Sequence, residues 1–161
     1  MKPISTNPEI QEAFKLICQT GHPDIQERGF TCLKDMADAE DMEAAAILGF
    51  SCQFEYNSFY NLEISRKYID MSADASNPKG QYYKGSLLID GIPPYEKDPI
   101  MGKWLMEQAA KQGEEDAINE LDNRYRERTP EEIAKMFRKS VISLMFWDIL
   151  DFITKPFKRK Y

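Results

Sequence analysis

The side chains best suited to chemistry are one histidine, three cysteines and a surplus of carboxylates. His22 stands between a glycine and a proline in a predicted turn, and the sequence has no second histidine for a metal site. Cys18, Cys32 and Cys52 lack the paired spacing of zinc ligands. We therefore expect no catalytic residue, no metal and no cofactor, and we predict that the chain is not an enzyme.

Two other groups of residues have ordinary structural explanations. Gly80 and Gly85 fall within a helical pattern and do not follow a strand, so they do not form a phosphate-binding loop. The densest carboxylates gather at one predicted helix end, which is typical of a solvated surface: Asp35, Asp38, Glu40, Asp41 and Glu43.

Length and composition indicate one soluble domain of 161 residues. The first ten residues contain no apolar signal-peptide core, and no run reaches the roughly 18 apolar residues that span a bilayer. An odd number of cysteines without paired spacing favours reduced thiols. We therefore expect a cytoplasmic protein.

The charge is distributed unevenly. Residues 1–122 carry 11 Lys/Arg and 22 Asp/Glu, a net charge of −11, whereas residues 123–161 carry 10 and 5, a net charge of +5. An acidic body opposes binding of nucleic acid and favours a basic protein partner.

The strongest pattern is a block that occurs three times, at Cys32–Gly49, Tyr68–Gly85 and Leu105–Asp122. The copies start 36 and 37 residues apart, a period typical of helical repeat arrays. In register, the aligned positions are Met36-Ala37 with Ser72-Ala73 and Ala109-Ala110, then Glu40 with Ser76 and Gly113, then Ala44 with Gly80 and Ala117.

Apolar spacing and capping residues predict helices along the whole chain. A last helix begins with the capping box Thr129-Pro130-Glu131-Glu132, is apolar almost all round from Met145 to Phe152, and is expected to cap the array. The predicted helices cover Pro8–Thr20, 23–39, Met42–Phe54, Leu62–Ala75, Lys79–Asp90, Ile100–Gln112, 114–126 and Thr129–Thr154.

The spacing resembles the Sel-one-like repeat family, short relatives of the tetratricopeptide arrays. The resemblance rests on Ala44 with Leu48-Gly49, and on a nearly complete unit formed by Gly85, Gly91, Asp98, Trp104, Ala109-Ala110, Gly113, Ala117 and Leu121. The chain departs from the family at Lys84, Asp122 and Gly80, where the family has Leu, Gly and Ala.

The resemblance implies an all-α fold, an α/α superhelical solenoid of antiparallel helix pairs that binds proteins on its concave face. We expect a single domain with N-terminal capping helices in 1–29, degenerate repeats in 30–122, and a basic capping helix and tail in 123–161.

The repeat register nominates residues for partner binding. In the family's geometry, the first-helix face of each pair points toward the concavity. The nominated positions on that face are Glu43, Ile47, Tyr83, Asp116 and Glu120, and Ile92 and Tyr95 of a proline-rich loop are a second, exposed candidate contact.

These observations predict a non-catalytic protein–protein interaction module for a basic partner. A narrower version is an inhibitor or immunity-type protein that neutralises a basic toxin domain. One alternative is a membrane-surface adaptor acting through the C-terminal helix and the basic tail Lys155–Tyr161. Another is an uncharacterised hydrolase of the Sel-one-like family, which would require a perturbed acid or a low-pKa thiol in a deep pocket.

Overall fold

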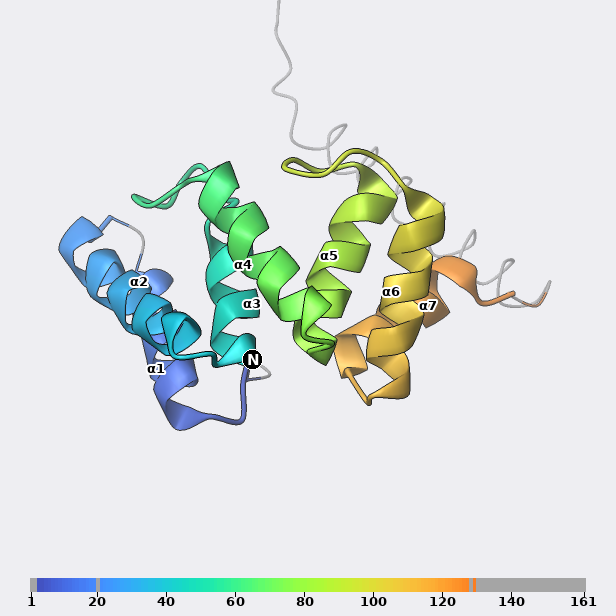
Figure 1. Ribbon diagram of the computed structural model, residues 1–161, viewed down its shortest axis with the longest axis horizontal. Helices are drawn as coiled ribbons and strands as arrows, with labels where there is room; N and C mark the ends of the chain where they lie inside the picture. The colour runs from blue at the N-terminus through green and yellow to red at the C-terminus, as the bar shows by residue number, and fades with distance from the viewer. Residues whose placement is uncertain (1–2, 20, 128, 130–161) are drawn as a thin grey trace, which may run out of the picture. The chain divides into compact units, whose positions relative to one another are not determined.

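The computed structural model describes residues 3–19, 21–127 and 129 (Figure 1). These residues form seven helices and no strand. Residues 1–124 make one compact unit, and 125–161 belong to a second unit that is described only in part. The helices are α1 (Pro8–Ile17), α2 (Pro23–Asp38), α3 (Met42–Ser51), α4 (Leu62–Asp74), α5 (Pro78–Asp90), α6 (Pro99–Lys111) and α7 (Glu115–Tyr125).

Each predicted helix within 3–127 is present, with ends within three residues of the predicted ones. Side-chain caps explain why the starts were predictable. Asp41 accepts hydrogen bonds from the amides of Glu43 and Ala44, and Asn77 does the same for Lys79 and Gly80. The predicted helix Thr129–Thr154 and the tail Lys155–Tyr161 lie outside the described residues, apart from Thr129.

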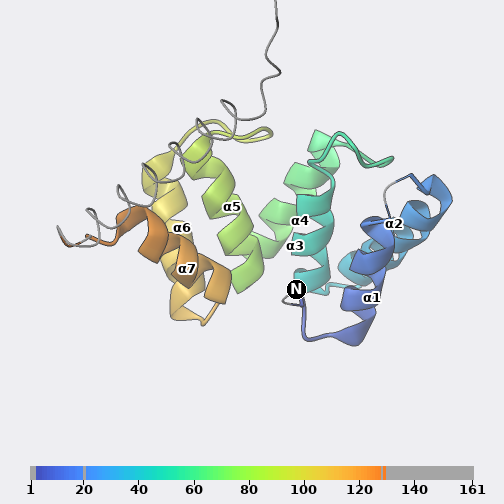
Figure 2. The same ribbon diagram turned by 180° about the vertical axis from the view of Figure 1, so that it is seen from behind.

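From α1 to α6, consecutive helices pack against each other, and α3 also contacts α1 and α5. Hydrogen bonds from Tyr82 and Ser86 to Glu120 link α5 to α7. The helices α1, α3, α5 and α7 therefore follow one another along one side of the unit, which we call the odd-helix face (Figure 2).

The turns that lead into α3, α5 and α7 are built alike. The three positions that the sequence register aligns all have a positive φ, 66° at Glu40, 60° at Ser76 and 89° at Gly113. In each turn the next residue donates its amide to a carbonyl five residues earlier, as in Asp41 to Met36 at 3.0 Å. This is the Schellman ending of a helix, repeated at the period of the sequence.

The helix pairs meet at very short distances where the chain has glycine. A Cβ on Gly85 of α5 would lie 2.7 Å from the carbonyl oxygen of Gly102 in α6. A Cβ on Gly49 of α3 would lie 2.8 Å from the carbonyl oxygen of Ser65 in α4. Since Ser65 and Gly102 are 37 residues apart, the two pairs have the same packing contact.

The largest apolar cluster joins α1, α2, α3 and, through Tyr68, α4, and the ring of Tyr83 from α5 is also part of it. A smaller cluster of Ile89, Met106, Ala109 and Ala117 joins α5, α6 and α7. The three cysteines are unpaired, and burial raises the pKa of the Cys52 thiol to about 12. No helix in the described part of the chain is long and apolar enough to cross a membrane.

Candidate functional site

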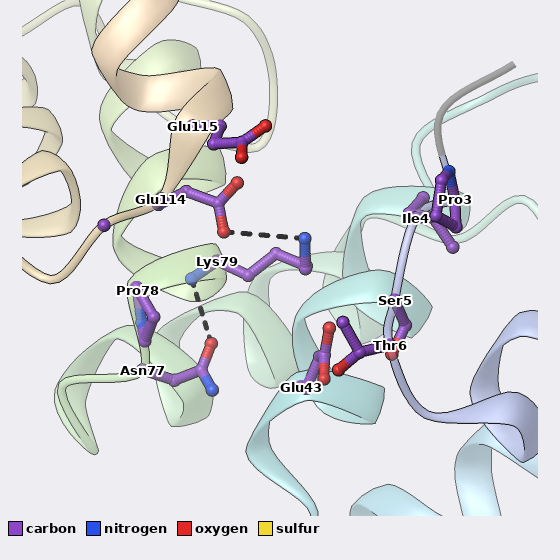
Figure 3. Close-up of a pocket in the computed structure, with 11 residues that line it drawn as sticks. Pro3, Ile4, Ser5, Thr6, Glu43, Asn77, Pro78, Lys79, Glu114 and Glu115 are labelled. Atoms are coloured by element: carbon purple, nitrogen blue, oxygen red, sulfur yellow. Dashed lines mark hydrogen bonds and ion pairs between the residues drawn. The ribbon is translucent and has the colours of Figure 1, made fainter.

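An acidic pocket of about 330 Å³ lies at the N-terminal ends of α3, α5 and α7 (Figure 3). The repeat brings these ends together, because each period places a helix start at the same edge of the unit. One wall is the N-terminal segment Pro3–Thr6. The other lining residues are Glu43, Asn77, Pro78, Lys79, Gly113, Glu114 and Glu115.

Lys79 is the one cation among these lining residues. Its ammonium group lies 3.5 Å from the carboxylate of Glu114, and both side chains are only 11% exposed. Glu43 and Thr6 line the same pocket (Figure 3). The side chain of Asp41 caps the start of α3. The carboxylate of Glu43 does not take part in the cap and faces the pocket.

The segment Pro3–Thr6 is held against the pocket by its backbone. The amides of Ile4 and Ser5 donate to the side-chain oxygen of Gln11, at 2.9 and 3.4 Å. The amide of Asn7 donates to the hydroxyl of Ser5 at 2.9 Å, and the Ile4 side chain packs against the main apolar cluster. Sequence reasoning missed this wall because the segment has no helical or strand periodicity.

Two tyrosines lie next to the acidic pocket on α5. Burial, followed by the nearby Tyr82, Glu114, Asp116 and Glu43, raises the pKa of Tyr83 far above its usual value. Burial and the carboxylate of Glu120 likewise raise the pKa of Tyr82. Three nominated residues, Glu43, Tyr83 and Asp116, therefore occupy one neighbourhood.

Glu120 mainly links α7 to α5 through side-chain hydrogen bonds. Its carboxylate accepts hydrogen bonds from Tyr82 at 3.0 Å, from Ser86 at 3.2 Å and from Arg124 at 2.8 Å. Arg124 also binds Asp90 with two hydrogen bonds, at 2.9 and 2.6 Å. Glu120 thus lies on the odd-helix face with its hydrogen-bonding capacity largely satisfied inside the protein.

The structure contradicts three of the surface nominations. Tyr83 is only 7% exposed, because its ring belongs to the largest apolar cluster and stacks on Phe50. Ile47 is fully buried, because α3 packs against four other helices and residues 44–49 are all buried. Tyr95 is only 6% exposed, since its hydroxyl donates to Asp70 at 3.0 Å and the guanidinium of Arg66 lies 5.6 Å from its ring centre. Ile92 is 43% exposed and remains a surface residue, away from the acidic pocket.

Within the described ranges, no three His, Cys, Asp or Glu side chains are grouped so that they could hold a metal ion. Burial raises the pKa of the Cys18 thiol as well as that of Cys52. No protein-family model, curated protein or solved structure matches the chain.

Proposed function

We propose that the chain is a non-catalytic interaction module whose odd-helix face binds a basic segment of a partner protein. The acidic pocket is the observation that carries this proposal. Five carboxylates lie on or beside it, Asp41, Glu43, Glu114, Glu115 and Asp116, and among the described lining residues Lys79 supplies the one ammonium group. The formal charge of this group is therefore −4.

Helix dipoles oppose this charge but do not cancel it. Each helix N-terminus acts as about +0.5 of an elementary charge, so three of them contribute about +1.5. The pocket therefore stays negative, and it belongs to a body whose formal charge is −11 over residues 1–122. Lysine and arginine side chains are the protein groups that complement such a surface.

We infer that the helix pairs continue as an α/α solenoid related to the Sel-one-like repeats. In register, Ile118 of α7 corresponds to Gln81 of α5 and Ala45 of α3, both of which are buried. Ile118 is 46% exposed. The apolar stripe of residues 133–153 in the sequence is typical of a helix that caps such an array.

The acidic charge also suits the narrower role of neutralising a basic toxin domain. The hydrolase alternative needs an activated thiol or acid, whereas burial makes Cys18 and Cys52 less acidic. The membrane-surface alternative depends on Lys155–Tyr161, which lie outside the described residues.

The test is a pull-down from native extract at low and high salt, with bound proteins identified by mass spectrometry. We expect one dominant basic partner, released by salt. A pocket variant, E43Q/E115Q/D116N, should lose this partner. A control with the same charge change on exposed positions, D24N/E27Q/E63Q, should keep it. Equal binding by both variants, or no partner at either salt concentration, would refute the proposal.

A further inference from the structure

A second hollow, of about 320 Å³, lies between the C-terminal ends of α1 and α3. We call it the aromatic groove. Its volume is about twice that of an apolar cavity of about 150 Å³ that binds benzene, so the groove has room for an aromatic side chain. Its principal lining residues are Phe14, Ile17, Cys18, Phe50, Phe54 and Tyr56.

A continuous series of ring contacts leads from this groove to α5. Tyr56 stacks on Phe54 with ring centres 5.3 Å apart, and Phe54 meets Phe50 edge to face at 5.2 Å. Phe50 stacks on Tyr83 at 4.2 Å with an interplanar angle of 8°, and Tyr83 lies 5.3 Å from Tyr82. These five rings connect the aromatic groove to the tyrosines beside the acidic pocket.

Tyr56 is 68% exposed although the loop that carries it is held firmly. The next residue, Asn57, donates to the carbonyl of Ser51 at 2.8 Å and accepts from Gln26 at 3.3 Å. Phe59 then stacks on Phe30 at 5.0 Å. An aromatic ring fixed at the rim of an apolar groove loses little conformational entropy on binding, which is typical of binding hot spots.

The other end of the series is acidic. Burial and the charges of Glu114, Asp116 and Glu43 raise the pKa of Tyr83, and the hydroxyl of Tyr82 donates a hydrogen bond to Glu120 at 3.0 Å. The aromatic groove lies at the C-terminal end of α3 and the acidic pocket at its N-terminal end, and a helix of 10 residues is about 15 Å long. A short extended segment that occupies the groove can therefore reach the negative charge of the pocket.

We propose that the aromatic groove takes an aromatic anchor from the basic partner segment, and that flanking arginines of the same segment bind at the acidic pocket. This inference rests on the proposed function and adds a second requirement to it. Charge alone would select any basic segment, whereas the groove selects basic segments that carry an aromatic residue.

The probe is a short fluorescein-labelled peptide of Gly, Ser and Arg with one central Trp, titrated by fluorescence anisotropy at low salt. Replacing the Trp by Ala, or Tyr56 by Ala, is expected to weaken binding about tenfold, in the range of a single hot-spot residue. Y60A is the matched control, since Tyr60 is also exposed but does not line the groove. It should bind like the wild type.

Cys18 gives a second readout because it is exposed and lines the groove. In a C32S background, the Trp peptide should slow alkylation of Cys18, and the Ala peptide should not. If both peptides bind equally and protect Cys18 equally, the anchor is refuted while the basic-partner proposal stands. If neither peptide binds at low salt, both proposals are overturned.

Discussion

Replacing Gly85 by alanine tests the packing on which the odd-helix face depends. The new Cβ would lie 2.7 Å from the Gly102 carbonyl oxygen and 3.1 Å from the Met106 amide nitrogen. Both are backbone atoms of α6, so neither can rotate away as a side chain would. The helices α5 and α6 must separate instead, and the neighbouring contacts lose part of their dispersion energy.

Two effects of opposite sign decide the outcome. Alanine in place of glycine within a helix favours folding by about 1 kcal/mol. Overpacking costs about 1–3 kcal/mol, and contact with rigid backbone places this site in the upper part of that range. We expect a net loss of about 1–2 kcal/mol. With an m value of about 2 kcal/mol/M, the urea midpoint falls by about 0.5–1 M.

The assay is urea unfolding followed by circular dichroism of the helical signal. N119A is the control, because Asn119 is an exposed position of α7 where alanine brings only its helix propensity. This control should raise the midpoint slightly. A higher midpoint for G85A than for the wild type would show that the close approach of α5 and α6 is wrong.

Three further predictions follow from particular charges. In a double-mutant cycle of K79M and E114Q, the free energies of unfolding measured in urea should show a coupling of about 1 kcal/mol, because the ion pair is largely buried. Additive effects of the two substitutions would contradict the ion pair. The hydrogen bonds from Arg124 hold the pKa of Asp90 below its usual value. The wild type should therefore be more stable than D90N above about pH 4, and this advantage should disappear as acid protonates Asp90 in the folded state. A difference in urea midpoint that does not change with pH would contradict this prediction. Burial raises the pKa of Tyr68 to about 12 from 10.0, so the urea midpoint should fall between pH 10 and 12, and Y68F should fall less steeply.

The helices were predictable because their signals are local. Apolar spacing defines a buried face, and Asp41 and Asn77 both look like caps in the sequence and act as caps in the structure. The repeat register aligned Glu40 and Ser76 with Gly113, but the sequence did not predict their positive φ, since neither is a residue that suggests it.

The wall formed by Pro3–Thr6 could not be predicted because this segment has no helical or strand periodicity. The burial of Tyr95 could not be predicted because it depends on residues distant in sequence. Tyr95 is covered by Arg66 and binds Asp70, 25 residues earlier in the chain. Ile47 is different, since a sequence signal was available. Residues 44–49 are apolar without interruption, which indicates a helix enclosed on all sides and leaves no exposed position for Ile47.

A repeat whose side chains have diverged can form a specific site, because the repeat fixes where those side chains lie. Glu43, Lys79 and Asp116 occupy one register position, at the first turns of α3, α5 and α7. The period fixes their location, so three different side chains meet at one edge of the unit. Their chemistry is free to vary, because the backbone contacts that hold the helices lie elsewhere, at Gly49 and Gly85. Architecture and recognition therefore depend on different positions of the same repeat, and substitutions at the acidic pocket should alter binding without unfolding the helix pairs.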